Sequence, residues 1–476
     1  MEVESSSILQ EKKPLLKKLL NKLLEKYEYA SILAADSAEK RYSVSTQGIN
    51  ITEGSLWSEI GYVARIYDGD TYSEYAFNYI DEENIDDIVN TIGTRLVLWK
   101  GRLPEEVKAR RFGKTEDEKI IFDRSTEYRI HPEQMGDDKI VRKISDIREK
   151  GLSKNSKLID FQVRVDYQIY HKIFLSPLKD MTQNVMWTTG VMVLLAPSGQ
   201  EVKSSYKGVS CCGGAEILEQ MDEKIDEALA DLDRLLVSEP ITPGEYDCIC
   251  APDLTGMIVH EAFGHGVEMD MFVKERALAK EYIGKYVASP LVTMHDGAAS
   301  ANQAATFFFD DEGTLAHDTV IIEKGILKQG ICDEHSALSL HTAPTGNGRR
   351  QKTSHKAYTR MTNTFFEGGK DKYEDMLASI KYGFQLESAC SGMEDPKNWG
   401  IQCMVSIARE IKDGQFTGRI FSPIVLTGYV PDLLKSISMM TGDVELSGTG
   451  ACGKGYKEWV KVSDGGPYIK ARIRLG

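Results

Sequence analysis

The sequence predicts an α+β fold made of two domains. The chain has 476 residues, a length at which two or three domains are usual. Helical and strand-like patterns are mixed in the first half, whereas the second half holds mostly short β-like runs separated by glycine turns. Between them, the proline-containing segment Ser238–Gly244 breaks both patterns. We therefore predict an N-terminal mixed α/β domain over residues 1–240, followed by a mostly antiparallel β domain over residues 241–476 that carries the active-site helix.

The elements of the first half follow from their periodicity. Leucines at a 3.6-residue spacing, with lysines opposite, predict an amphipathic helix that begins at Pro14. We expect this helix to pack on its own domain rather than on a membrane, because the rest of the chain is acidic. Alternating residues predict strands, with a hairpin turn at Asp68–Asp70. The predicted strands cover residues 30–35, 42–51, 61–67, 73–79, 157–173 and 184–195, and the further helices cover 83–99, 132–150 and 215–237.

The second half is poorer in helix signals. A short strand over residues 246–251 leads into a helix over residues 254–263. Two later segments, residues 373–380 and 430–440, also have a helical pattern. The remaining β-like runs cover residues 306–310, 319–327, 400–411 and 419–427. Short strands with glycine turns are typical of antiparallel β structure.

Composition restricts the classes of function. The net charge of −14 argues against nucleic-acid binding, which needs a basic face to neutralise phosphates. No apolar run approaches the roughly 18 residues that span a bilayer, and the first residues lack the apolar core of a secretory signal. The eight cysteines are too sparse for a disulfide scaffold, and neither Cys211-Cys212 nor Cys248-x-Cys250 has a partner pair at zinc-ribbon spacing. We expect a cytoplasmic protein with reduced thiols.

The most informative stretch is His260-Glu261-Ala262-Phe263-Gly264-His265, which follows an apolar run. Two imidazoles and a carboxylate are the residue set of a hydrolytic zinc site, with two nitrogen ligands and a base. The common zinc-protease motif is His-Glu-x-x-His, in which both ligands lie on one helix face. Here the histidines are five residues apart, and on an ideal α-helix they would point about 140° away from each other.

Two local distortions would bring His260 and His265 together. A π-type turn adds one residue to a helical turn, and such turns are common at functional sites. Alternatively, the helix ends just before His265. Gly264 and Gly266 flank this histidine and make either distortion easy. We therefore predict that both histidines are metal ligands.

Zinc also needs a third protein ligand and an open position for water. Glu268, Asp270 and His295 lie nearby in the sequence. Cys452 is distant, but it lies in a glycine-rich segment whose backbone can approach a site closely, and a zinc-bound cysteine is a thiolate. Spacing alone does not choose among these four residues.

Several blocks together resemble a known family. The stretch His260–Asp270 resembles the active-site helix of the TldD/PmbA metalloprotease family, which uses this His-Glu-x-x-x-His spacing. The resemblance covers about residues 245–455, and it implies that Cys452 is the third zinc ligand and that this chain is similar to the catalytic, motif-bearing branch. The other matching blocks are Phe309–Thr314, Pro344–Arg350, Arg360–Thr364 and Cys452–Lys454.

These observations predict a zinc-dependent metallopeptidase. His260, His265 and Cys452 would hold Zn²⁺, and Glu261 would accept a proton from the attacking water and deliver it to the leaving amine. The resemblance implies an unfolded peptide as substrate, bound as an added β-strand. We also expect Asp270 to orient one of the ligand histidines.

Five further residues are candidates for substrate binding. Arg349, Arg350 and Arg360 have the chemistry to bind a substrate carboxylate or backbone, and internal salt bridges are an equal alternative. Asn347 and Asn363 are candidate donors to a substrate carbonyl, with turn formation as the alternative.

Two other functions stay open. The family has been linked by name to the modulation of DNA gyrase, so one alternative is a non-catalytic protein that binds a partner and keeps a structural metal site. The intact Glu261 favours catalysis over this reading. The other alternative is a metal-dependent hydrolase of a different amide. The resemblance implies a two-subunit particle, either a homodimer or a heterodimer with a motif-less relative.

Overall fold

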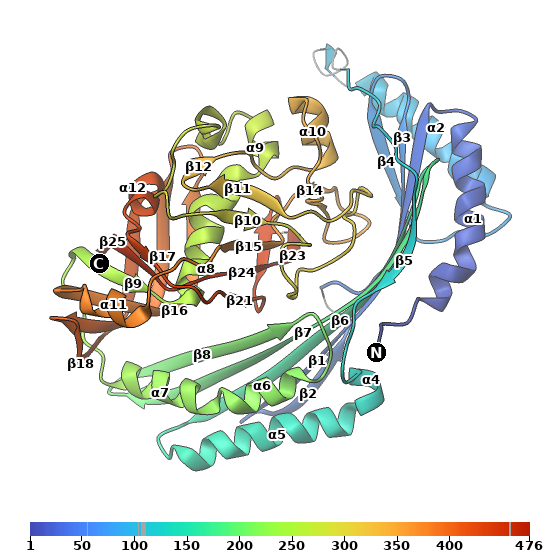
Figure 1. Ribbon diagram of the computed structural model, residues 1–476. Helices are drawn as coiled ribbons and strands as arrows, with labels where there is room; N and C mark the ends of the chain where they lie inside the picture. Colours follow the sequence, from blue (N-terminus) through green and yellow to red (C-terminus); the bar gives the residue numbers. More distant parts are fainter. Residues whose placement is uncertain (55, 103, 106–110, 457) are drawn as a thin grey trace.

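A long, curved sheet forms the first half of the molecule (Figure 1). The computed structural model describes residues 1–476 except 55, 103, 106–110 and 457. The sheet runs in the order β4-β3-β1-β6-β7-β5, with β2 added to β1 and β8 added to β7. Its strands are β1 (Tyr29–Ser45), β2 (Gly48–Glu53), β3 (Glu59–Tyr67), β4 (Tyr72–Phe77), β5 (Ile120–Ser125), β6 (Asp160–Leu175), β7 (Lys179–Ser198) and β8 (Glu201–Cys211).

Helices cover the convex side of this sheet, and the second half of the chain lies on its concave side (Figure 1). Both faces of the sheet can be buried because successive side chains of a strand point to opposite faces. Ile32 and Ala34 of β1 pack with the leucines of α1, whereas Leu33 between them packs with Phe309 from the second half. The helices are α1 (Ser7–Leu24), α2 (Ile85–Arg102), α4 (Pro132–Met135), α5 (Asp137–Lys154), α6 (Ile217–Glu223) and α7 (Ile225–Leu236).

The second half contains two larger sheets, and nearly all their pairings are antiparallel. One sheet runs β16-β9-β25-β19-β17-β18 with β20 on β25, and the other runs β12-β11-β10-β15-β24-β21. The pairs β9–β16 and β15–β24 are parallel. The strands of the first are β9 (Gly244–Cys250), β16 (Tyr382–Asp395), β17 (Gly400–Lys412), β18 (Gln415–Phe421), β19 (Ile424–Tyr429), β20 (Met439–Met440) and β25 (Ile469–Leu475). Those of the second are β10 (Met294–Asp296), β11 (Thr319–Glu323), β12 (Ile326–Leu327), β15 (Asn363–Phe366), β21 (Glu445–Ser447) and β24 (Ser463–Gly466).

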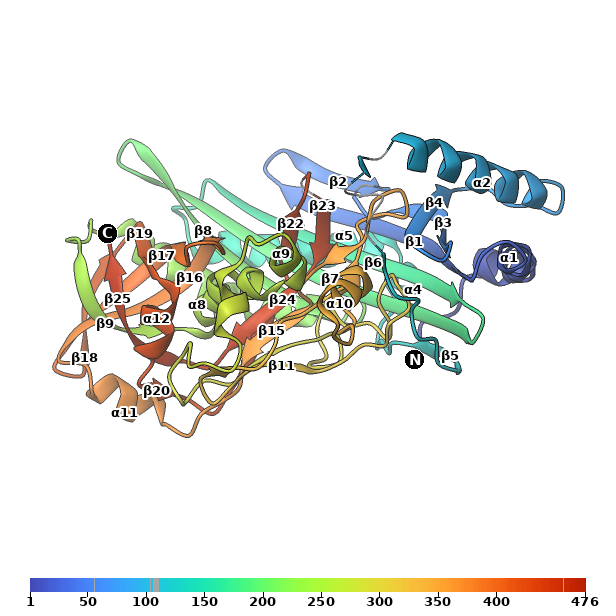
Figure 2. The same cartoon turned by 90° about the horizontal axis from the view of Figure 1, so that it is seen from above.

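Two small hairpins and several short helices complete this half. The hairpins pair β13 (Gly348–Arg349) with β14 (Tyr358–Thr359), and β22 (Ala451–Lys454) with β23 (Glu458–Lys461). Helix α8 (Pro252–Met257) packs against strands of both larger sheets, which holds the motif that follows it in the middle of the core (Figure 2). The other helices are α9 (Met269–Val273), α10 (Glu334–Leu340), α11 (Tyr373–Ala378) and α12 (Val430–Lys435).

The predicted α+β class is confirmed, and several predicted boundaries are wrong. Helix α1 begins at Ser7 because the Ser6 side chain caps it by accepting from the backbone N–H of Leu9, so Pro14 lies inside the helix. The predicted helix over 132–150 is divided at Gly136, whose φ is +83°. The predicted helix over 215–237 is divided at Lys224, and the helix over 430–440 ends at Lys435.

The strand predictions also needed correction. The predicted strand over 42–51 is the end of β1 and part of β2, with a hairpin turn between them. Residues 306–310 form no strand and contribute one isolated bridge, between Phe309 and Leu315. Strands β5, β8, β16 and β25 were not predicted. No helix in the described part of the chain is long and apolar enough to cross a membrane.

Candidate metal centre

The helix that carries the motif changes its winding at the motif itself. Pro252 occupies the first turn of α8, where a missing N–H costs nothing. Residues Ile258–Gly264 then form a π-helix, and His265–Val267 form a short 3₁₀ turn. The backbone N–H of His265 donates to the carbonyl of His260, an i→i−5 bond that closes a π-type turn between the two histidines. The predicted π-type distortion is thus confirmed.

This turn brings the two imidazoles together. Their ring centroids are 5.1 Å apart, and the rings are nearly perpendicular at 86°. The other face of the same turn is fully buried through Ile258, Val259 and Phe263. Burial of this face fixes the rotation of the helix, so the histidines point in one direction.

The two flanking glycines are needed for space rather than for unusual torsions. Gly264 has ordinary right-handed helical angles, with φ −62° and ψ −53°. A Cβ placed on Gly264 would lie 2.2 Å from the sulfur of Met361, and one on Gly266 would lie 2.6 Å from a carboxylate oxygen of Glu394. Close packing over the motif is thus a reason for glycine at both positions that the sequence did not predict.

The third donor arrives from the far end of the chain. Cys452 lies on β22, paired with Val460 of β23, and its sulfur is 3.6 Å from Nε2 of His265. Ligand atoms of His260, His265 and Cys452 all lie within 4.8 Å of one another, and within the described ranges they are the one such group of three. Tetrahedral zinc with ordinary Zn–N and Zn–S lengths separates N from S by about 3.6 Å, so the donor set fits this ion.

The charges around Cys452 favour its thiolate form, which is the form that binds a metal. Burial opposes ionisation of Cys452, but His265 and His260 together hold the pKa of its thiol well below the ordinary value. Burial alone would lower the pKa of His265, and the nearby Cys452 and Glu268 instead raise it well above its ordinary value. Both shifts favour a thiolate at Cys452, and binding of a cation would replace the protons on the imidazoles.

A carboxylate behind His265 orients this ligand. Oε2 of Glu268 lies 3.3 Å from Nδ1 of His265, on the opposite side of the ring from Cys452. A hydrogen bond to Nδ1 leaves Nε2 free to act as the donor to a metal. Glu268 is fully buried. This role was predicted for Asp270, which instead forms ion pairs with Lys274 and Lys454.

Lys454 ties the hairpin to the motif. Its ammonium lies 2.9 Å from Glu268 and 2.6 Å from Asp270, and it donates to the carbonyl of Thr359 at 3.0 Å. Glu268 and Asp270 are thus engaged by a lysine, which removes them as ligand candidates. His295 is removed as well, because its two nitrogens lie 2.8 Å from Asp318 and 2.9 Å from Glu367.

The predicted substrate-binding residues make contacts within the chain. Arg360 is fully buried and donates to the carbonyls of Cys452 and Glu458, so it holds the hairpin that carries the third ligand. Arg349 donates to the carbonyls of Met361 and Lys461. These internal bonds show a structural use of both arginines.

The other three candidates are also internally bonded. Arg350 forms a two-pronged ion pair with Glu74 of the first sheet, at 2.9 and 3.2 Å. Asn347 donates to Asp296 and to the carbonyl of Arg360. The Asn363 amide donates to the carbonyls of Gly297 and Ala301 and to Thr306. The alternative of an internal salt bridge thus fits Arg350, whereas both asparagines join distant segments rather than form turns.

Two carboxylates lie beside the histidines. Glu261 is half-buried on the π-helix, and Gly392 of β16 lies directly over it, because a Cβ on Gly392 would be 2.4 Å from Cγ of Glu261. Two residues further along the same face of β16, Glu394 lies against Gly266. Burial raises the pKa of Glu394 well above its ordinary value. Sequence reasoning did not single out Glu394, and it treated Glu268 only as a possible ligand.

An α+β fold that holds two histidines and a cysteine at metal-ligand distance, with a glutamate next to the first histidine, contains the residue set that a metallopeptidase site requires. Comparison with known proteins agrees. Residues 243–473 match the family model of the PmbA/TldA metallopeptidase C-terminal domain. This C-terminal half of the chain is therefore similar to the TldD/PmbA family.

Curated relatives carry related names. A metalloprotease of Methanothermobacter thermautotrophicus is 29% identical over 58% of this chain and 61% of its own length. A TldD homologue of Buchnera aphidicola, named a metalloprotease, is 35% identical over 49% of this chain and 48% of its own length. A zinc metalloprotease TldD homologue of Saccharolobus solfataricus is 30% identical over 53% and 57% of the two chains. The matches thus span about half of these relatives.

Solved structures share the whole fold. TldE from Thermococcus kodakarensis superposes with a TM-score of 0.75 at 16% identity, covering 97% of this chain and 99% of the other. A putative modulator of DNA gyrase from Bacteroides thetaiotaomicron gives a TM-score of 0.73 at 15% identity, covering 98% and 99%. At these identities the likeness shows the fold alone.

Proposed function

We propose that this chain is a zinc-dependent peptidase that hydrolyses unfolded peptides. The observation that carries the proposal is the convergence of His260, His265 and Cys452 next to Glu261. Three protein ligands with an open fourth position are typical of catalytic rather than structural zinc sites. The name of the S. solfataricus relative supports zinc as the metal.

Each residue has a defined part in this proposal. His260, His265 and Cys452 hold the ion, and Glu268 keeps His265 in the tautomer that donates through Nε2. A bound zinc ion supplies a Lewis acid and lowers the pKa of water towards about 7. Glu261 accepts a proton from the attacking water and passes it to the leaving amine. Its place beside His260 on a half-buried turn keeps it open to a substrate on one side.

The decisive experiment separates Glu261 from the metal. In the zinc-loaded protein, Glu261→Gln should keep its zinc and lose peptide cleavage by at least about 100-fold, the usual size of a lost general base. Cleavage is followed by mass spectrometry of an unstructured peptide mixture, with a chelator-treated sample as the second control. Glu323→Gln, at an exposed residue that ends β11, is the matched control and should cleave normally.

Three results would contradict the proposal. Unchanged cleavage by Glu261→Gln would remove this residue as the base. Stoichiometric zinc with no cleavage of any peptide by the wild-type protein would favour a structural metal site in a partner-binding protein. Cleavage of a non-peptide amide in place of peptides would assign a different hydrolase.

Location and assembly are further parts of the proposal. We propose a cytoplasmic protein, supported by eight free cysteines, a pattern of reducing compartments. We also propose a two-subunit particle, supported by the family resemblance. Cell fractionation tests the first, and mass measurement of the protein alone and with a motif-less relative tests the second.

A further inference from the structure

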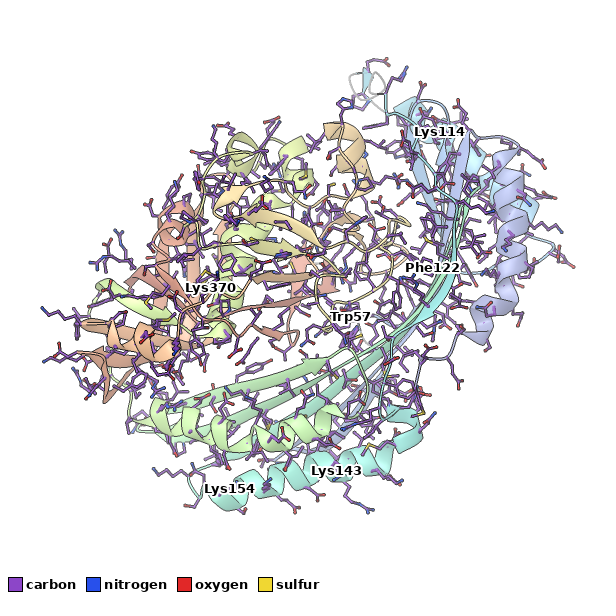
Figure 3. All side chains as sticks on the ribbon, in the orientation of Figure 1. Trp57, Lys114, Phe122, Lys143, Lys154 and Lys370 are labelled. Carbon is purple, nitrogen blue, oxygen red and sulfur yellow. The ribbon has the colours of Figure 1, made fainter. Side chains whose placement is uncertain are left out.

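A cavity lies where the second half of the chain meets the concave face of the long sheet. Its volume is about 70 Å³. By the same measure one water molecule needs roughly 10–15 Å³, so there is room for a small organic molecule. Figure 3 shows Trp57 in the angle between the sheet and the second half of the chain. The residues that matter here are Trp57, Tyr170, Trp187, Phe307, Arg349 and Lys461, all in the cavity wall.

Lys461 is the unusual member of this wall. Its side chain is 7% exposed, and among the described residues it has no hydrogen bond and no ion pair within 4 Å. Its ammonium lies 4.5 Å from the centre of the Trp187 ring. The other cations of the wall are engaged: Lys172 pairs with Asp311, and Arg349 binds two backbone carbonyls. A buried cation without an anion is unstable. The described residues supply no anion at contact distance from this amine.

The cavity is separate from the metal centre. Cys452 and Val460 are directly paired on the β22–β23 hairpin and share one of its faces. Trp459 and Lys461 alternate with Val460 and point to the other face. All three residues line the cavity, whereas Cys452 does not. The hairpin thus forms a wall between the thiolate and the amine.

The polarity of the wall selects the kind of ligand. Indole and phenyl groups of Trp57, Trp187 and Phe307 offer an apolar surface, with one unpartnered cation at Lys461. Asp311 also lines the cavity. Burial raises the pKa of its carboxyl, but Lys172 and Arg350 hold this pKa below the ordinary value, so its negative charge disfavours a doubly charged anion such as phosphate.

We propose that this cavity binds a small monocarboxylate, with its carboxylate on Lys461 and its apolar part against Trp57, Trp187 and Phe307. This site is independent of the proposed peptidase activity. Its ligand class is a carboxylic acid of a few heavy atoms, for which acetate is the simplest probe.

The charged surroundings of Lys461 fit this role. Burial lowers the pKa of Lys461 to about 7, Asp166 and Glu39 raise it, and Arg164 lowers it further. The two carboxylate oxygens of Asp166 are already paired, one with Arg41 and the other with Arg164. An incoming carboxylate would therefore meet an amine whose charge no nearby acid neutralises at contact distance.

Tryptophan fluorescence of the full-length, zinc-loaded protein tests the proposal. Three of the five tryptophans line the cavity, namely Trp57, Trp187 and Trp459. Sodium acetate, titrated at constant ionic strength with chloride, should give a saturable change that methylammonium chloride does not give. Lys461→Met should lose this change, and Lys412→Met, at the exposed end of β17, should keep it.

The pH dependence provides a test that needs no variant, in case Lys461→Met does not fold. Binding requires the protonated amine, so the acetate dissociation constant of the wild-type protein should rise about tenfold between pH 6 and pH 8, for a group that titrates near pH 7. Absence of saturable acetate binding at pH 6, binding retained by a folded Lys461→Met protein, or equal binding of phosphate would each overturn the proposal.

Discussion

The ammonium of Lys454 lies 2.9 Å from the carboxylate of Glu268. The two residues are 186 positions apart in the sequence. Each follows a metal ligand closely, Glu268 after His265 and Lys454 after Cys452. The side chains of Glu268 and Lys454 are 2% and 12% exposed, respectively. Their ion pair therefore joins the two halves of the candidate metal centre inside the core.

Replacing Glu268 should weaken metal binding without removing a ligand. Glu268→Gln loses the charge that orients His265 and neutralises Lys454, and loss of such a partner typically costs about 10- to 100-fold in metal affinity. Competition for zinc with a chromophoric chelator measures the effect. Glu367→Gln is the matched control, because Glu367 contacts His295, far from the ligands. Equal affinities of the two variants would refute the orienting role.

Replacing Cys452 should abolish stoichiometric zinc. Cys452→Ser removes the one soft donor, and the two imidazoles that remain are too few for a tight site. Metal content after gel filtration is the measurement. Cys403→Ser, a fully buried cysteine outside the donor set, should retain about one zinc per chain. Normal zinc content in Cys452→Ser would remove Cys452 as a ligand.

Adding a methyl group at Gly264 should destabilise the protein. Alanine is favoured over glycine in a helix by up to about 1 kcal/mol. Here the new Cβ would lie 2.2 Å from the sulfur of fully buried Met361, and overpacking of this kind costs about 1–3 kcal/mol. Overpacking therefore exceeds the helix gain, and the chemical denaturation midpoint should fall.

Gly428→Ala provides the control for this prediction. Nothing lies within 4 Å of a Cβ at Gly428, so its midpoint should stay near that of the wild type. A Gly264→Ala protein as stable as Gly428→Ala would show that the packing over the motif adapts.

The buried amine of Lys461 should make stability depend on pH. Its pKa is about 7 in the folded chain and near the ordinary lysine value of about 10.4 in the unfolded chain. Between these values the unfolded chain binds a proton that the folded chain does not, so this group makes stability rise with pH, by at most about 1.4 kcal/mol per pH unit. Denaturant unfolding at pH 7, 8 and 9 should show a smaller rise in Lys461→Met. If the wild-type protein and Lys461→Met had the same dependence of stability on pH in acetate-free buffer, the lowered pKa of Lys461 would be contradicted.

The local features of this molecule could be predicted from the sequence alone. The extra residue between His260 and His265 predicted either a π-type turn or a helix end, and a backbone hydrogen bond from His265 to His260 shows the π-type turn. The α+β class followed from patterns with periods of two and 3.6 residues. These patterns express burial of one face of each element, which the sequence records directly.

Boundaries were less predictable, because caps and turns compete with periodicity. Ser6 extends α1 beyond Pro14, and Gly136 interrupts a helical pattern that is otherwise continuous. The hairpin turn within the strand predicted at 42–51 could not be recognised, because the segments on both sides of the turn carry similar residue types.

Only the tertiary structure decided how the site is completed. Spacing alone left Glu268, Asp270, His295 and Cys452 open as the third ligand, and only the family resemblance pointed to Cys452. Packing of the β22–β23 hairpin brings Cys452 to the two histidines. The same packing gives Arg360 a structural partner in the carbonyl of Cys452 and leaves Lys461 without one. The helical turn depends on hydrogen bonds between residues five apart, which the sequence determines by itself. The third ligand and its supporting charges depend on contacts across nearly two hundred residues, and those exist only once the two sheets have packed around the helix.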